Sequence, residues 1–171
     1  LLSSDLQPAG DEALLSTTDP ERKLQAASRL LITSPKRLAA REKGLEQRLV
    51  KTLSPEDRLS RSRAWRREGA PSKAAVELRS LRWSGALEVE RRRELARAEI
   101  ESGSPLRALR VLPDGRNATA EDFVLRAQAY RNRAWHLYPG RGEIRAFTDC
   151  LGAVQRAADS GLPIGLFESA H

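Results

Sequence analysis

The chain has 171 residues and a formal net charge of +7, with 40% hydrophobic and 31% charged residues. The apolar share is large enough for a folded core, which excludes wholesale disorder. A single cysteine, Cys150, excludes a disulfide framework, and the two histidines, His136 and His171, are too few for a histidine-based metal site. We therefore expect no cofactor and no metal. The sequence contains no Met, even at position 1, so we expect an excised fragment or a processed product.

The start signals of helices recur along the chain as a capping residue followed by proline. They stand at Asp19-Pro20, Ser34-Pro35, Ser54-Pro55 and Ser104-Pro105. Pro71 opens another helix, and Thr119, with Asp122 three residues later, resembles a capping box. Glycines at positions 69, 85, 103 and 161 mark the ends of helical stretches.

Between these signals, leucine and alanine recur at the spacing that gives a helix one apolar face. After Pro35 the pattern predicts one helix that continues through Leu38, Leu45 and Leu49. No stretch alternates with the period of two that is typical of a strand. The sequence therefore predicts an all-α protein, in which short links make neighbouring helices antiparallel.

These signals predict three parts of the chain. Residues 1–18 form an irregular leader or the end of a preceding repeat, residues 19–161 form a helical-repeat domain, and residues 162–171 begin the next helix. No apolar run approaches the ~20 residues that a membrane-spanning helix needs, so we expect no membrane span.

Two stretches of the chain repeat each other at a fixed offset. Gly69 and Gly103 are 34 positions apart (103 − 69). The same offset relates Pro71 to Pro105, Ala74 to Ala108 and Leu78 to Leu112. This is the length of a tetratricopeptide repeat. The sequence therefore predicts a right-handed α-α superhelix of tetratricopeptide-like hairpins.

Side chains at the matching positions fit such hairpins. Small residues are needed where two helices cross closely, and they stand at Ser62, Ala96 and Ala127. A bulky aromatic residue follows three positions later in two of the three units, as Trp65 and Tyr130, whereas the middle unit has Glu99. The third unit is longer than the others, so we expect an extended loop over residues 135–142.

Two runs of sequence carry a resemblance to a known family. LSPEDRLSR (residues 53–61) and FVLRAQAYR (residues 123–131) resemble hairpins in the superhelical region of soluble lytic murein transglycosylases. The resemblance covers roughly residues 19–161. It implies a long α-superhelix that precedes a lysozyme-like catalytic domain, in a protein that acts on peptidoglycan in the bacterial periplasm.

Candidate catalytic residues have simpler structural interpretations. In the family, the catalytic acid belongs to a Glu-Ser pair, and Glu168-Ser169 matches only that pair, since His171 stands where the family has phenylalanine. Glu168 is instead expected at the start of a helix. Cys150 could pair with His136 as nucleophile and base, but it lies on an apolar helical stripe and is expected to be a small core residue. We expect no catalytic residue, and the chain by itself is not expected to be an enzyme.

Arginines cluster around aromatic residues in several places. This pattern could bind nucleic acid through phosphates and base stacking. We do not expect it here, because Trp65 and Tyr130 are assigned to the core and acidic residues interrupt every cluster. The candidate binding surface consists of Arg63, Arg66, Arg67, Trp83, Arg131, Arg133 and Trp135.

The sequence thus predicts a non-catalytic scaffold, the superhelical part of a peptidoglycan lytic transglycosylase, which positions the enzyme on or around glycan strands in the periplasm. The alternative is a tetratricopeptide adaptor for protein–protein interaction, for which a cytoplasmic location also fits. The expected partner is accordingly peptidoglycan or a protein. The basic surface of either would attract anionic partners in a salt-sensitive way.

Overall fold

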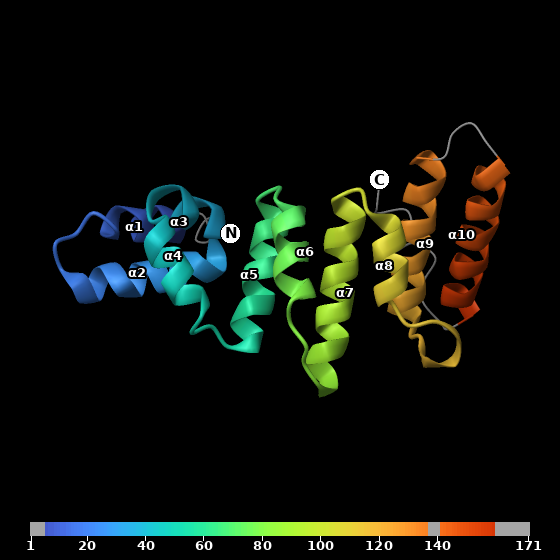
Figure 1. Ribbon diagram of the computed structural model, residues 1–171, viewed down its shortest axis with the longest axis horizontal. Helices are drawn as coiled ribbons and strands as arrows, with labels where there is room; N and C mark the ends of the chain where they lie inside the picture. The colour runs from blue at the N-terminus through green and yellow to red at the C-terminus, as the bar shows by residue number, and fades with distance from the viewer. Residues whose placement is uncertain (1–5, 137–140, 160–171) are drawn as a thin grey trace. The chain divides into compact units, whose positions relative to one another are not determined.

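Figure 1 shows the computed structural model, which describes residues 6–136 and 141–159. These residues form helices and no strand, which confirms the predicted all-α class. The chain divides into two compact units, Leu1–Leu87 and Glu88–His171.

The first unit is built on a central helix, α2. Its described helices are α1 (Leu6–Leu14), α2 (Pro20–Thr33), α3 (Pro35–Arg41), α4 (Lys43–Val50), α5 (Pro55–Arg67) and α6 (Pro71–Arg79). Helix α2 packs against α1, α3, α4 and α5, and α5 pairs with α6. The core around α2 consists of Leu15, Ala26, Ala27, Leu30, Leu31 and Leu38. Burial of these leucines and alanines provides the main favourable free energy of this unit.

Two of the predicted helix starts in this unit are confirmed by their hydrogen bonds. Asp19 Oδ1 accepts a hydrogen bond from the backbone N–H of Glu21 over 3.0 Å. Ser54 Oγ accepts one from the backbone N–H of Asp57 over 3.1 Å. Each side chain satisfies an amide that the first turn of its helix leaves without a partner.

For residues 1–18 we predict an irregular leader or the end of a preceding repeat, and residues 6–14 of this segment form helix α1. One expectation for this unit is wrong in detail. The single helix predicted from Pro35 to Leu49 is interrupted at Glu42, whose φ of −136° and ψ of 56° are not helical. Gly44 follows the break, and its low helix propensity reduces the cost of interrupting the helix there.

The second unit contains the remaining described helices. They are α7 (Gly85–Glu101), which begins just before the division between the units, α8 (Pro105–Val111), the 3-10 turn η1 (Gly115–Asn117), α9 (Ala120–His136) and α10 (Arg141–Asp159). Helices α9 and α10 form the closest pair, and α8 packs against α9. A core cluster joins α7, α8 and α9 through Ala96, Ile100, Ala108, Leu112, Leu125 and Ala129. Alanines at half of these places let the helices approach closely.

Helix α5 ends in a Schellman motif. The N–H of Gly69 donates to the carbonyl of Arg66, and the N–H of Ala70 donates to the carbonyl of Trp65, both over 2.9 Å. Gly69 has a φ of +73°, which an L-residue with a side chain rarely adopts.

Helix α7 ends in the same motif, 34 residues later. Gly103, with a φ of +77°, donates to the carbonyl of Ile100 over 3.1 Å, and Ser104 donates to the carbonyl of Glu99 over 2.7 Å. In both cases the next helix begins with proline two residues after the glycine. The 34-residue repeat in the sequence is therefore also a repeat of local structure.

The third pair of helices differs from the prediction. We expected the extra residues between Ala127 and Ala146 to lengthen the loop over residues 135–142. Instead α9 extends to His136 and α10 begins at Arg141, so part of the excess lengthens the two helices. Residues 137–140 lie outside the described part of the chain, as do residues 160–171, where the next helix was predicted.

Candidate functional site

A groove of about 820 Å³ lies in the first unit, among α3, α4, α5 and α6. We call it the α3–α6 groove. It is lined by apolar, cationic, acidic and hydroxyl side chains: Ala39, Glu46, Val50, Arg58, Arg61, Trp65, Ser72, Lys73, Val76, Glu77 and Ser80. Its volume falls in the range of ligand-binding clefts.

Arg61 of α5 joins three helices at this groove. Its Nη1 donates to Glu77 Oε1 of α6 over 2.8 Å, and its Nη2 donates to the carboxylate of Glu46 on α4. The side chains are only 6% exposed for Arg61, 14% for Glu46 and 11% for Glu77. One guanidinium therefore balances two carboxylates in a place that water barely reaches.

Burial changes the electrostatic environment of these groups. Desolvation raises the pKa of Glu77 above its usual range, although Arg61 opposes this effect. The Nε of Arg61 is buried and has no hydrogen-bond partner among the described residues. Its guanidinium carbon lies 5.5 Å from the centroid of the Trp65 ring, which is a favourable cation–π distance.

Trp65 forms part of the groove and is contacted by a second cation. Its side chain is buried, as the sequence predicted, and the whole residue is 3% exposed. Lys73 Nζ, from the first turn of α6, lies 4.4 Å from the ring centroid. The ring is therefore held by packing and by two cations, and Lys73 itself is exposed.

Arg58 of α5 binds the carbonyls at the end of the preceding helix. Its Nη2 donates to the carbonyl of Val50 over 3.0 Å, and its Nε donates to that of Leu53 over 3.4 Å. These carbonyls lie at and just after the end of α4, where backbone acceptors lack helical partners.

Arg126 of α9 is the counterpart of Arg61 in the second unit. Each arginine lies seven residues after its capping residue, Ser54 or Thr119. Arg126 also lies beside the aromatic residue four positions later, with its guanidinium carbon 5.9 Å from the Tyr130 ring centroid.

The partners of Arg126 differ from those of Arg61. Its Nη1 donates to the carbonyls of Leu109 and Leu112, at 3.4 and 3.3 Å, and its Nη2 donates to Asp114 over 3.0 Å. Arg126 therefore closes the end of α8, whereas Arg61 neutralises two carboxylates.

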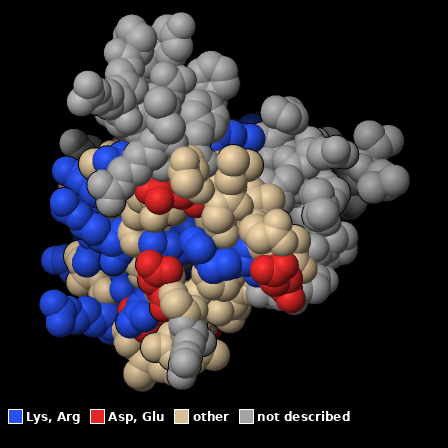
Figure 2. Space-filling view, turned by 90° about the vertical axis from the view of Figure 1, so that its right-hand side faces the viewer, with Lys and Arg blue, Asp and Glu red and all other residues tan. Residues whose placement is uncertain are grey.

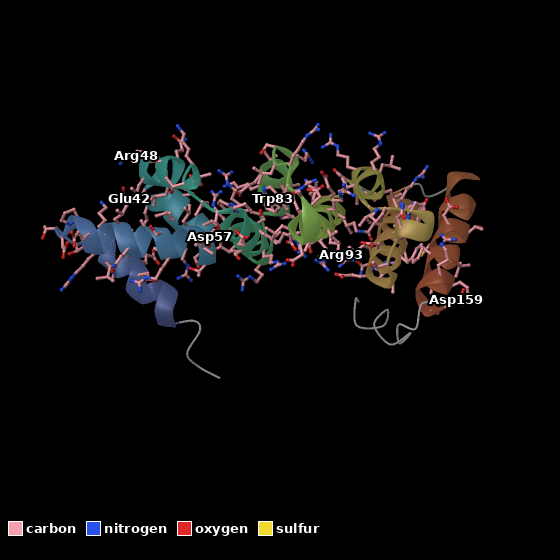
Figure 3. The ribbon with its side chains drawn as sticks, turned by 90° about the horizontal axis from the view of Figure 1, so that it is seen from below. Glu42, Arg48, Asp57, Trp83, Arg93 and Asp159 are labelled. Carbon is pink, nitrogen blue, oxygen red and sulfur yellow. The ribbon has the colours of Figure 1, made fainter. Side chains whose placement is uncertain are left out.

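A second network lies at the start of α9. Thr119 and Asp122 form the predicted capping box, since Asp122 Oδ2 accepts from the N–H of Thr119 over 2.8 Å. Arg93 of α7, labelled in Figure 3, donates to Asp122 Oδ1 over 3.0 Å and to Glu121 over 2.7 Å. Burial opposes the charge on Asp122, but the hydrogen bonds from Arg93 and Thr119 outweigh it and lower the pKa of Asp122.

The basic residues predicted as a binding surface do not line the α3–α6 groove. Arg63 and Arg67 of α5 are exposed and Arg66 is half-buried. Trp83 is half-buried in the segment that joins α6 to α7 (Figure 3). Arg131 and Arg133 of α9 are half-buried, and the side chain of Trp135 lies outside the described part. The binding role of these seven residues stays a prediction.

Acidic side chains lie between the basic ones on the face of the molecule that Figure 2 shows. Ion pairs between acidic and basic side chains are frequent in the second unit: Glu121 binds both Arg93 and Arg97, and Glu88 binds Arg91 and Arg92. Many of the arginines therefore form ion pairs within the fold.

The candidate catalytic residues of the sequence analysis are Cys150, His136 and Glu168. Cys150 is half-buried on α10, and its thiol donates to the carbonyl of Ala127 over 3.3 Å. Burial raises the pKa of the Cys150 thiol, which disfavours the nucleophilic thiolate. The side chain of His136 and the whole of Glu168 lie outside the described residues.

The sequence analysis missed the residues of the α3–α6 groove. A signal was present, because Arg61 interrupts the buried face of α5 beside Leu59, Ala64 and Trp65, and a buried arginine needs carboxylate partners. The identity of those partners follows only from the packing of α4 and α6.

Comparison with protein-family models, with curated proteins and with solved structures finds no match to this chain. Within residues 6–136 and 141–159, no group of three or more His, Cys, Asp or Glu side chains is arranged to hold a metal ion. None of the helices described is both long and apolar enough to cross a membrane.

Proposed function

We propose that this chain is a non-catalytic helical-repeat scaffold, whose helices stack as a tetratricopeptide-like superhelix. The observation that carries the proposal is the recurrence of one structural unit at an offset of 34 residues: a helix that ends in a Schellman glycine, followed by a helix that begins with proline. Repeats of this kind bury their apolar faces by stacking on their neighbours, and the resulting arrays present long binding surfaces.

We further propose that the parent protein is a peptidoglycan lytic transglycosylase of the bacterial periplasm, and that the scaffold positions it on glycan strands. The support is the resemblance of residues 53–61 and residues 123–131 to hairpins in the superhelical region of soluble lytic murein transglycosylases. The first run contains the cap and the first turns of α5, and the second lies within α9. Each contains an arginine, Arg61 or Arg126, whose guanidinium lies beside the aromatic ring four positions later.

Co-sedimentation of the purified chain with peptidoglycan sacculi tests this role. The proposal predicts that the chain sediments with sacculi, that added salt releases it, and that the chain alone does not clear a sacculus suspension. A chain that stays in the supernatant at low salt would contradict the peptidoglycan role.

The α3–α6 groove favours a second candidate function, that of an adaptor for protein segments. It has the size of a binding cleft and combines apolar with charged side chains. Binding of a peptide, without retention on sacculi, would support the adaptor over the peptidoglycan scaffold.

A further inference from the structure

The α3–α6 groove contains two cations, Arg58 and Lys73, that form no ion pair with a carboxylate of the described residues. From this we propose that it binds an acidic segment of a partner protein, in which an apolar side chain lies next to a carboxylate. The proposal rests on the adaptor function above and names the chemistry of its partner.

The charged residues of the groove fall into two sets, those that form ion pairs with one another and those that form none. Glu77 and Glu46 occupy the two terminal nitrogens of Arg61, and its Nε is buried, so we assign this arginine to these two acids. The hydrogen bonds of Arg58 go to backbone carbonyls, and Lys73 Nζ lies over the Trp65 ring. Among the described residues no carboxylate forms an ion pair with either cation, although the charge of Arg58 also acts on Glu77. An acidic ligand would supply a carboxylate partner, above all to the exposed Lys73.

The apolar part of the groove argues for a peptide with a hydrophobic side chain. Val76 is 63% exposed although it lines the groove, and Val50 and Ala39 line it as well. Covering Val76 would remove apolar surface from water at about 25 cal/mol per Å². The hydroxyl of Ser72 can hydrogen-bond to backbone groups of an extended chain, and that of Ser80, which donates to the carbonyl of Glu77, can accept from a backbone N–H.

The same residues disfavour nucleic acid. Single-stranded nucleic acid binds through several phosphate contacts and through exposed aromatic rings on which bases stack. Trp65 is 3% exposed and its ring already contacts Lys73, so it offers no stacking surface.

Fluorescence anisotropy with the full chain tests the proposal. The probes are a labelled short peptide of alternating Glu and Leu, the same peptide with Gln in place of Glu, and a labelled oligo-dT. We expect the acidic peptide to bind at least about tenfold more tightly than the other two and its binding to weaken with salt. Equal binding of the acidic and amide peptides, or tighter binding of oligo-dT, would overturn the proposal.

A matched pair of variants locates the site. Lys73 and Arg107 occupy the third position of α6 and α8, each two residues after the proline that begins its helix, and both are exposed. Lys73→Glu is expected to weaken binding of the acidic peptide about tenfold, because it replaces attraction by repulsion. Arg107→Glu makes the same charge change outside the groove and is expected to leave the affinity within about twofold.

A further variant tests the apolar contact. Val76→Asn is expected to weaken the peptide about threefold to tenfold while the folded fraction, followed by circular dichroism, stays constant. If Arg107→Glu weakens binding as much as Lys73→Glu, the groove is not the site. Retention of the chain on sacculi is measured separately, so failure of the peptide to bind would reject this inference and leave the scaffold role to its own test.

Discussion

Arg61 Nη1 donates to Glu77 Oε1 over 2.8 Å, and the remaining Nη2 of the same guanidinium binds Glu46. Helices α4, α5 and α6 are therefore joined at one buried point by charges as well as by apolar packing. Removing one partner of such a group leaves an uncompensated charge, which is costlier than losing the whole group.

Arg61→Met is expected to destabilise the chain by about 3–5 kcal/mol, because both glutamates lose their counter-charge. The measurement is urea unfolding followed by circular dichroism. The triple variant Arg61→Met, Glu46→Gln, Glu77→Gln is the control and is expected to recover most of the loss. If the triple variant is as unstable as the single one, the buried charge is not the cause.

The raised pKa of Glu77 gives the stability of this site a pH dependence. A carboxyl with a folded-state pKa above its ordinary value of 4.5 stabilises the fold at acidic pH, and this contribution is lost as the pH rises through the folded-state pKa. In Arg61→Met the opposing effect of the arginine is gone, so its destabilisation is expected to be smaller at pH values below 4.5. A deficit that is the same at neutral and acidic pH would contradict this assignment.

Asp122 is expected to behave in the opposite way. Its folded-state pKa lies below the ordinary value of 3.8, so its carboxylate stabilises the fold above pH 3.8 and loses this effect as the pH falls towards the folded-state pKa. Asp122→Asn is expected to cost about 1–3 kcal/mol at neutral pH, because Arg93 and Thr119 lose their buried, charged acceptor. Urea unfolding of both proteins from pH 7 down to 3 should show the difference shrink, and a constant difference would disprove the role of the ionised carboxylate.

The two Schellman glycines are expected to respond alike to substitution. Gly69→Ala and Gly103→Ala each force a side chain into a positive φ and are expected to cost about 1 kcal/mol. Neither added methyl group meets another atom within 4 Å, so the cost is conformational. Gly10→Ala, within helix α1, is the control and is expected to stabilise by about 0.5–1 kcal/mol. Thermal unfolding measures all three. A cost at only one of the two repeat glycines would argue against their equivalence.

Local signals in the sequence were sufficient for much of the fold. The starts at Asp19, Ser54 and Thr119 are predictable because the capping side chain and its backbone partners are close in sequence. The 34-residue offset of Gly69 and Gly103 identifies equivalent helix ends for the same reason.

Packing between helices that are distant in the sequence could not be predicted from such local signals. No capping or proline signal marks the break at Glu42, and the helices on either side of it, α3 and α4, both pack against α2. The partners of Arg61 are fifteen and sixteen residues away on two other helices, so its environment emerges only when α4 and α6 are placed. The sequence-based prediction favoured clusters of arginine, and none of the seven residues predicted as a binding surface lines the groove.

Small-angle X-ray scattering of the full chain most directly tests the central claim that these helices stack as a repeat scaffold. A compact globular chain of 171 residues has an expected radius of gyration of about 16 Å. A tetratricopeptide-like superhelix predicts a clearly larger value and a pair-distance distribution with an extended tail. A radius of gyration near 16 Å with a symmetric distribution would contradict the stacked-repeat account.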